Sequence, residues 1–241
     1  MTNSGKHQPV RPFSPGALPP RHKAVHGIRI IGGQFKGRRL IYNGFVTVRP
    51  MRDRVREALF AHLGPQVEGK RVFDLFAGTG AMGLEALSRG ASHATFVERH
   101  HPTLETLRQN ISLLGVQARC EVVFGDCFIW AKRLKPPSDP APWLVFVCPP
   151  YAYFHDHQGA VTELLIRLLE LAPTGSILVA ESDDHYRGQG LPSEVPWQRR
   201  DYGQTVLWIA SKDSPDMKEA GGSEEGSSDE ERLEDSIPPF C

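Results

Sequence analysis

The hydrophobic and polar positions between residues 70 and 211 follow two alternating periods. Short apolar runs, typical of buried strands, alternate with longer segments that carry an apolar residue every three or four positions, typical of helices. The predicted strands are 72–74, 94–98, 120–124, 143–147 and 176–180, and the predicted helices are 84–88, 102–114, 127–134 and 158–171. This alternation predicts a mostly parallel sheet with helices on both faces.

Two more strand patterns close the predicted domain. Residues 197–202 and 205–210 flank Gly203, which favours a tight turn, so we expect an antiparallel pair at the end of the sheet. Such a pair is more typical of class I methyltransferases than of nicotinamide dehydrogenases. The sequence therefore predicts an α/β fold of the Rossmann-like, class I methyltransferase kind with a terminal antiparallel strand pair.

The chain before this domain predicts a small extension. Residues 28–31 and 39–42 are strand-like, and the glycine-containing segment 32–37 between them predicts a β-hairpin. Pro50 ends any strand, and residues 51–63 predict a helix with one apolar stripe.

Charge is distributed unevenly along a chain whose formal net charge is zero. Residues 1–56 hold 12 lysines and arginines and one acidic residue, whereas residues 212–241 hold ten acidic and three basic residues. The asymmetry favours an amino end that faces nucleic acid, although a patchy soluble surface would give the same counts. We predict four parts: a disordered basic arm (1–24), a hairpin and arginine-rich helix (25–66), the main domain (67–211) and a disordered acidic tail (212–241).

Basic side chains gather on the predicted extension. Arginines at the start of a helix favour phosphate contact, because a guanidinium matches phosphate oxygens in a bidentate way. A solvated helix face with local pairing of Arg56 and Glu57 is the structural alternative. The candidate RNA-binding residues are Arg29, Lys36, Arg38, Arg39, Arg49, Arg52 and Arg56.

Several other classes of protein are disfavoured. The four cysteines have no CxxC or framework spacing, which favours the free thiols of a cytoplasmic protein. No run approaches the roughly 18 apolar residues of a membrane span, and residues 1–25 lack a signal peptide's apolar core. The pairs His100–His101 and His155–His157 lack further ligands at zinc spacing, so no metal site is expected.

The segment 72–83 is the main candidate for ligand binding. An apolar strand ends at Asp74, a turn with Gly78, Gly80 and Gly83 follows, and a helix then begins. Glycines let the backbone approach a ligand closely, and a helix N-terminus at the carboxyl end of a strand favours a nucleotide. The glycine spacing also fits a dinucleotide, so it does not decide between cofactors.

Three carboxylates lie at or just beyond successive predicted strand ends: Asp74, Glu98 and Asp126. We expect Glu98 to accept hydrogen bonds from both ribose hydroxyls of an adenosyl ligand. Asp126 would lie near the adenine amine, and Asp74 near the amino-acid end, directly or through the glycine turn. Glu98 alone would suit NAD as well, and a helix cap or salt bridge is the structural alternative for each acid.

The fourth predicted strand ends in Cys148-Pro149-Pro150-Tyr151, a pattern typical of enzymes that methylate amines. The prolines make the turn rigid. The polar side chain and a backbone carbonyl would accept hydrogen bonds from the target amine, and the aromatic ring would stack on an extruded base. A tight strand-to-helix turn with a core tyrosine is the structural alternative.

Together these segments resemble the bacterial small-subunit (16S) ribosomal RNA guanine-N2 methyltransferases, the RsmD-like family, from about residue 29 to 209. The anchors are 29–33, 48–50, 55–60, 74–80, 83–89 and 146–151. The resemblance implies S-adenosylmethionine as cofactor and a guanine exocyclic amine of ribosomal RNA as acceptor. Carried over, the cofactor-binding residues are Asp74, Phe76, Gly78, Thr79, Gly80, Gly83, Glu98 and Asp126, and the catalytic residues are Cys148, Pro149, Pro150 and Tyr151.

One position departs from the family pattern, which has aspartate where this chain has Cys148. A carboxylate accepts two amine hydrogens and offsets the growing positive charge, whereas a neutral thiol is a weak acceptor. Loss of one such partner costs about 10²–10³ in rate. Three outcomes are open: slow methylation with help from the Pro149 carbonyl, binding without turnover, or a thiolate at Cys148, which burial disfavours.

The sequence therefore predicts an S-adenosylmethionine-dependent enzyme that methylates a guanine N2 amine of small-subunit ribosomal RNA without a metal. The alternative is a catalytically weakened ribosome-assembly protein that binds the same cofactor and RNA, and a third interpretation is a nicotinamide oxidoreductase. The expected partner is ribosomal RNA, free or in an assembling small-subunit particle. The expected state is a cytoplasmic monomer without membrane contact.

Overall fold

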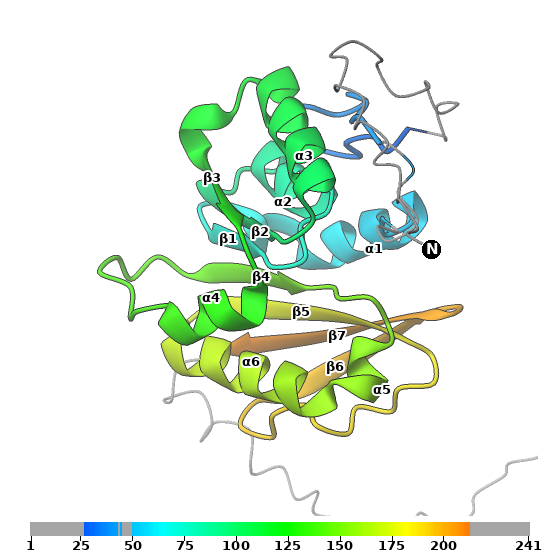
Figure 1. Cartoon of the computed structure of the whole chain (residues 1–241), viewed down its shortest axis with the longest axis vertical. Coiled ribbons are helices and arrows are strands. Elements are labelled where there is room, and N and C mark those ends of the chain that lie inside the picture. The colour runs from blue at the N-terminus through cyan, green and yellow to red at the C-terminus, as the bar shows by residue number, and fades with distance from the viewer. Residues whose placement is uncertain (1–26, 43, 45–49, 213–241) are drawn as a thin grey trace, which may run out of the picture.

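The computed structural model describes residues 27–42, 44 and 50–212 and contains one seven-stranded sheet (Figure 1). Its order is β3-β2-β1-β4-β5-β7-β6. The first five strands are parallel, β7 is antiparallel to β5, and β6 is antiparallel to β7. The strands are β1 (Arg71–Asp74), β2 (His93–Glu98), β3 (Cys120–Phe124), β4 (Trp143–Val147), β5 (Ser176–Asp183), β6 (Trp197–Tyr202) and β7 (Thr205–Lys212). The parallel sheet with a terminal antiparallel pair is as predicted. The predicted arm (1–24), the tail beyond residue 212 and Arg49 lie outside the described residues.

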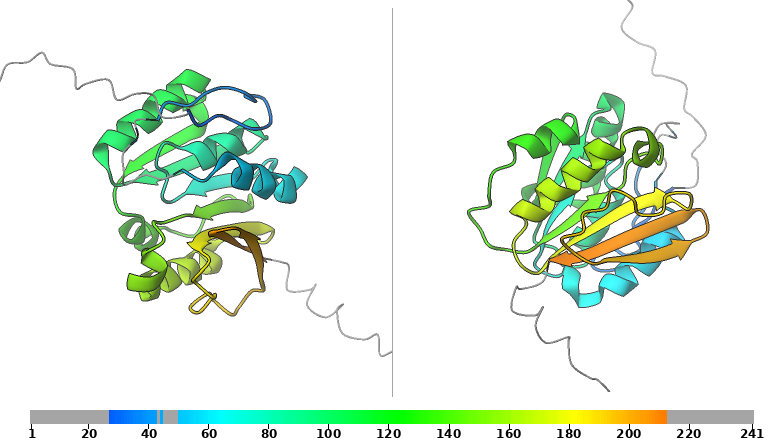
Figure 2. Two further views of the ribbon diagram at one scale, coloured as in Figure 1. Left: turned by 90° about the vertical axis from the view of Figure 1, so that its right-hand side faces the viewer. Right: turned by 90° about the horizontal axis from the view of Figure 1, so that it is seen from below.

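Helices cover both faces of the sheet (Figure 2). Side chains of α1, α2 and α3 form one buried cluster with the sheet, and side chains of α4, α5 and α6 form the other. On β4, Leu144 and Phe146 belong to the first cluster and Val145 and Val147 to the second, which explains why this strand is apolar throughout. The helices are α1 (Asp53–Leu63), α2 (Ala81–Ser88), α3 (His101–Leu114), α4 (Cys127–Arg133), α5 (Tyr153–Asp156) and α6 (Gln158–Leu171), with 3₁₀ turns at η1 (Gly64–Val67) and η2 (Gln117–Arg119).

The order of the strands reverses between β1 and β4. From β1 the chain builds β2 and β3 on one side, and it then returns to β4 and β5 on the other. Asp74 pairs with Phe146, so β1 and β4 end at the same level of the sheet. The connections after these two strands lead to opposite faces, which leaves a crevice at their carboxyl ends.

The predicted N-terminal hairpin forms only in part. The chain doubles back as expected, but Arg29 and Arg39 make an isolated bridge in place of two paired strands. Three backbone hydrogen bonds join its two sides, from Ile30 N to Arg38 O, Gly37 N to Ile30 O and Leu40 N to Ile28 O. The segment also bonds to α2: the N–H groups of Ile31 and Gly32 donate to the Glu85 carboxylate at 2.7 and 2.8 Å. Gly33 has φ of 74°, and a Cβ there would lie 1.8 Å from the carbonyl oxygen of Ser88. The hairpin is therefore held both by its own backbone bonds and by the side chains of α2.

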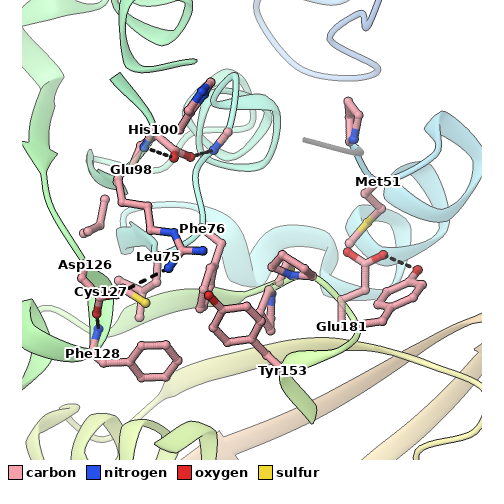
Figure 3. A pocket seen from close by; sticks show the side chains of 18 of the residues that line it. Met51, Leu75, Phe76, Glu98, His100, Asp126, Cys127, Phe128, Tyr153 and Glu181 are labelled. Atoms are coloured by element: carbon pink, nitrogen blue, oxygen red, sulfur yellow. Dashed lines mark hydrogen bonds and ion pairs between the residues drawn. The ribbon is translucent and has the colours of Figure 1, made fainter. Parts of the chain in front are cut away.

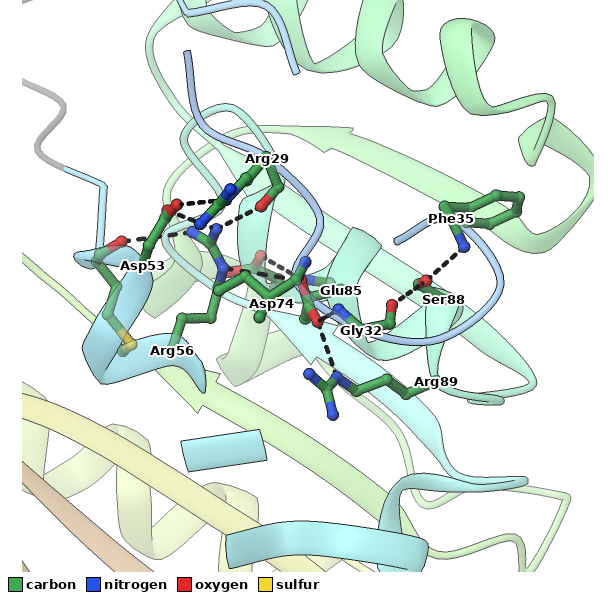
Figure 4. Close-up of polar contacts among 12 residues, drawn as sticks. Arg29, Gly32, Phe35, Asp53, Arg56, Asp74, Glu85, Ser88 and Arg89 are labelled. Carbon is green, nitrogen blue, oxygen red and sulfur yellow. Dashed lines mark hydrogen bonds and ion pairs between the residues drawn. The ribbon is translucent and has the colours of Figure 1, made fainter. Parts of the chain in front are cut away.

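Arg56 corrects the prediction of an RNA contact, because its side chain is fully buried (Figure 4). Its guanidinium donates to the carbonyl of Arg29 at 2.6 Å and to Asp53 at 3.0 Å, and its Nε lies 3.8 Å from the buried Glu85. Burial lowers the pKa of Arg56, and the charges of Asp53 and Glu85 oppose this. Arg89 donates to the same Glu85 carboxylate at 2.8 Å. The cluster therefore joins the N-terminal segment and α1 to α2.

We expect Arg56→Ala to lower the free energy of unfolding by about 3–5 kcal/mol, because it leaves the buried Glu85 without one of its two arginine partners. Urea unfolding followed by circular dichroism measures this change. Arg54→Ala is the matched control, since Arg54 is exposed on the same helix and its loss should change stability by less than about 0.5 kcal/mol. Equal losses in the two variants would contradict a structural role for Arg56.

Candidate functional site

A cavity of about 340 Å³ opens at the carboxyl ends of the central strands. Glu98, His100 and Asp126 lie at one end of it, Met51 and Glu181 lie at the other, and Phe76 and Tyr153 lie between them (Figure 3). The predicted site residues that line it are Phe76, Gly78, Glu98, Asp126, Cys148, Pro149, Pro150, Tyr151 and Arg52. The glycine turn and the strand end at Cys148 thus face a single space.

The other predicted cofactor residues lie behind the cavity wall. Asp74 is buried and accepts a hydrogen bond from the N–H of Gly83 at 3.0 Å, which ties the start of α2 to β1. Thr79 is buried, and its carbonyl accepts from Asn110 of α3 at 3.0 Å. A Cβ on Gly80 would lie 2.4 Å from a methyl of Leu107, and one on Gly83 would lie 2.3 Å from the ring of Phe96. These residues shape the turn and do not line the cavity.

Burial raises the pKa of Asp74 to about 7, and the negative charge of Glu98 adds to this rise. The hydrogen bond from Gly83 acts in the opposite direction. Asp74 is therefore protonated below about pH 7 and ionised above it. Asp74 does not line the cavity, so of its two predicted roles only the one through the glycine turn is compatible with its position.

Glu98 is held by two backbone groups at the edge of the cavity. Its Oε2 accepts from the N–H of Gly78 at 2.8 Å, and its Oε1 accepts from the N–H of His100 at 2.7 Å. A carboxylate oxygen can accept more than one hydrogen bond, so both oxygens keep capacity for the two hydroxyls of a ribose. The residues at this end therefore fit an adenosyl group.

Asp126 has two roles in the structure. It caps α4, since its Oδ1 accepts from the N–H groups of Phe128 and Ile129 at 2.8 and 3.3 Å. It also lines the cavity, where Arg99 lies 3.8 Å from its other oxygen. Asp126 can therefore cap the helix and still contact an adenine in the cavity.

Aromatic side chains form the middle of the cavity wall. The rings of Phe128 and Tyr153 are parallel, with an angle of 3° and centroids 6.0 Å apart. The Arg99 guanidinium lies 5.6 Å from the Tyr153 ring, and Phe76 meets both rings edge-on. This cluster offers flat apolar surface to a planar base.

At the opposite end, Tyr151 is fixed through its hydroxyl. The hydroxyl donates to Glu181 Oε1 at 3.0 Å and lies 2.9 Å from the Thr205 hydroxyl. Burial raises the pKa of the Cys148 thiol well above its ordinary value, and the charges of Glu181 and Asp74 and a hydrogen bond to Glu181 raise it further. Cys148 is therefore a neutral thiol, which removes the outcome in which a thiolate replaces the carboxylate.

The predicted RNA-binding residues fall into distinct groups. Arg52 is exposed at the cavity mouth, next to Met51. Arg56 is buried, and Arg49 lies outside the described residues. The side chains on the N-terminal segment that are exposed away from the cavity are Arg29, Lys36, Arg38 and Arg39.

Several cavity residues were not among the predicted ones: Met51, Arg99, His100, Phe128, Tyr153, Glu181 and Thr205. Glu181 had a signal, because it is an acid at the end of an apolar run, as Glu98 is. Arg99 and His100 directly follow Glu98, so their position just after the same strand indicated that they lie near the site. Phe128 and Tyr153 had none, since an aromatic residue after a strand is most often part of a core.

Within the described ranges, no group of three or more His, Cys, Asp or Glu residues could hold a metal ion. None of the helices in these ranges combines the length and the apolar character that a membrane crossing requires.

The family described as Conserved hypothetical protein 95 matches residues 28–211. The chain belongs to this family. Its relative in Escherichia coli strain K12, named Ribosomal RNA small subunit methyltransferase D, is 39% identical over 151 residues, which are 63% of this chain and 71% of the relative. The resemblance to the RsmD-like family is therefore confirmed.

Solved structures show the same fold. Putative methyltransferase yhhF from Escherichia coli superposes with a TM-score of 0.66 at 30% identity, over 78% of this chain and 98% of that one. An RNA methyltransferase from Salinibacter ruber in complex with S-adenosyl-L-homocysteine superposes with a TM-score of 0.51 at 16% identity, over 75% of this chain and 100% of that one. The second likeness concerns the fold alone. The predicted class I methyltransferase fold is confirmed.

We expect Asp74→Asn to remove a pH dependence of stability. Native Asp74 keeps its proton up to about pH 7, whereas the unfolded chain releases it near pH ~3.9. Between these values the native state binds more protons, so Asp74 makes the free energy of unfolding fall as pH rises, by something on the order of 4 kcal/mol in total. Urea unfolding of both proteins across this range measures the difference.

The stability of Asp74→Asn relative to wild type should therefore increase from pH ~4 to ~7 and then level off. Glu57→Gln is the control, since Glu57 is exposed on α1. A difference between wild type and Asp74→Asn that stays constant over the range would show that Asp74 titrates normally.

Proposed function

We propose that this protein uses S-adenosylmethionine to methylate the N2 amine of a guanine in small-subunit ribosomal RNA. The observation that carries the proposal is the single cavity that Gly78 and Glu98 share with Cys148, Pro149 and Tyr151. A methyl donor bound at the first end would meet a base held at the second. The nicotinamide alternative loses its basis, because the similar proteins from Escherichia coli are methyltransferases by name.

The cofactor end supplies three kinds of contact. Glu98 would accept hydrogen bonds from the ribose hydroxyls, and Asp126 would accept one from the adenine amine. The rings of Phe76 and Phe128 would contact the flat adenine, and the glycine turn would allow close approach of the backbone. S-adenosylmethionine, when bound, supplies a methyl group on a positively charged sulfur.

The acceptor end positions an amine. Pro149 is buried and Pro150 fixes the turn, so the carbonyl groups of this segment have little freedom. The Tyr151 ring is held from its hydroxyl end by Glu181 and Thr205, and it would stack on the target base. The Pro149 carbonyl would accept a hydrogen bond from the amine and aim its nitrogen at the methyl group.

Exposed cations lie both at the cavity and on the N-terminal segment. Arg52 stands at the mouth, and Lys36, Arg38 and Arg39 are exposed on the N-terminal segment. Such side chains bind phosphates without regard to sequence and would orient the RNA, while the cavity selects the base. The substrate we propose is ribosomal RNA, free or in an assembling small-subunit particle.

One observation favours the weaker alternative, in which the protein binds cofactor and RNA with little turnover. The raised pKa of Cys148 leaves a neutral thiol where the family resemblance implies an aspartate. A thiol is a poor acceptor for the amine hydrogens. Measurement of turnover separates the two functions.

We expect the purified protein to transfer methyl groups from S-adenosylmethionine to small-subunit ribosomal RNA that lacks the modification, with N2-methylguanosine as product. Mass spectrometry of the RNA nucleosides identifies the product. Methylation of another atom, or none, would contradict the proposal.

Glu98→Gln should weaken binding of S-adenosylhomocysteine about tenfold or more in calorimetry, because it removes a charged hydrogen-bond acceptor. Glu121→Gln, exposed on β3, is the matched control.

Replacement of Lys36, Arg38 and Arg39 together by glutamine should weaken RNA binding at low salt. The slope of log affinity against log salt concentration should become less steep by about 0.7–0.9 for each phosphate that the protein no longer neutralises. Fluorescence anisotropy over a salt series measures both quantities. Glutamine at Lys132, Arg133 and Lys135 makes the same charge change at exposed positions in and just after α4. Equal effects of the two triple variants would show that RNA binding depends on the net charge of the protein and not on the position of these cations.

A further inference from the structure

Glu181 lies beside Cys148 at the carboxyl edge of the sheet. Ala180 pairs with Val147 in the parallel register of β4 and β5, so Glu181 and Cys148 are the next residues of neighbouring strands. Val147 and Ala180 both belong to the cluster under α6, so the residues after them project toward the opposite face. Both side chains line the cavity.

The Glu181 carboxylate has a fixed orientation. Its Oε1 accepts a hydrogen bond from the Tyr151 hydroxyl at 3.0 Å, and that hydroxyl also lies 2.9 Å from Thr205. The hydrogen bond to Glu181 and the negative charge of Glu181 both raise the pKa of Cys148, so the carboxylate is close to the thiol. A carboxyl group is therefore present next to the position where the family resemblance implies an aspartate.

We propose that Glu181 is the carboxylate that accepts the hydrogens of the target amine in this protein, in place of an aspartate at position 148. This inference rests on the proposed function and identifies a catalytic residue for it. Neighbouring strands lie about 4.8 Å apart, and a glutamate side chain is one methylene longer than that of aspartate. The longer side chain can thus reach, from β5, toward the space in front of Cys148.

The chemical step balances without another reactant. The amine nitrogen uses its electron pair to form a bond to the methyl carbon, while the carbon–sulfur bond breaks and its electron pair stays on sulfur. Positive charge moves from sulfur to nitrogen, and one N–H proton passes to Glu181 and then to water. A carboxylate hydrogen-bonded to the amine stabilises the charge that develops on nitrogen.

A double-mutant cycle tests the proposal with Glu181→Gln, Cys148→Asp and the double variant. Glu181→Gln should lower kcat about 10²–10³-fold, with binding of S-adenosylhomocysteine unchanged, because Glu98 lies at the other end of the cavity. Cys148→Asp should change kcat far less in the wild-type background than in the Glu181→Gln background, because a carboxylate is already present in the wild type. In the Glu181→Gln background, Cys148→Asp should restore most of the missing rate, since either carboxylate then serves the same amine.

Tyr151→Phe separates this role from simple positioning of the tyrosine. It removes the hydroxyl that Glu181 holds, keeps the ring and leaves the carboxylate in place. We expect a smaller loss of kcat than in Glu181→Gln, with no rescue by Cys148→Asp. Equal losses in the two variants would show that Glu181 acts only through Tyr151. Glu163→Gln, exposed on α6, is the matched charge control.

A second readout does not depend on methyl transfer. Loss of the Glu181 charge should lower the pKa of Cys148, so iodoacetamide should alkylate the Cys148 peptide faster in Glu181→Gln at a fixed, mildly alkaline pH. Unchanged alkylation would place Glu181 away from the thiol and overturn the proposal.

The outcomes separate this proposal from the proposed function. If wild type is active and Glu181→Gln equals it, the role of Glu181 is overturned while the function stands. If wild type transfers no methyl group to ribosomal RNA, the proposed function fails and the role of Glu181 fails with it.

Discussion

The site depends on the way the chain leaves the sheet at β1 and β4. These two strands are paired in register, and the chain then turns to α2 on one face and toward α5 and α6 on the other. The backbone therefore diverges in the middle of the sheet, where buried side chains pack on both faces. A cavity at this point has walls from both faces, so a donor and an acceptor can be held by separate segments and still meet.

Much of the fold follows from residues that are adjacent in sequence. The apolar runs of β1 to β5 and the stripes of α3 and α6 predicted the correct elements, because their burial has a regular period. The N-terminal segment did not follow its local pattern. Only part of its backbone pairs across the hairpin, and Glu85 and Ser88 bond Ile31, Gly32 and Phe35, which a pattern within residues 28–42 cannot reveal.

The site shows the same division between local and distant causes. Glu98 and the segment 148–151 line the cavity as their position after strands suggested. Arg56 looked like a surface cation because its neighbours in sequence are charged, yet its partners Asp53 and Glu85 and the carbonyl of Arg29 enclose it. In the sequence, Cys148 indicated that the site lacks a carboxylate, but the structure places Glu181 of β5 beside it. Both corrections depend on residues from other parts of the chain: Arg29 and Glu85 for Arg56, and Glu181 for Cys148.

The attachment of the N-terminal segment has a consequence for protein synthesis. Residues 28–41 leave the ribosome early, but the side chains that hold them, Glu85, Ser88 and Asn110, follow 53–69 residues later. During that interval the segment can pair only with itself and with Asp53 and Arg56 of α1, because its partners on α2 and α3 do not yet exist. Docking of this segment is therefore a late event in co-translational folding, and the cations on it reach their final places only once α2 and α3 have formed.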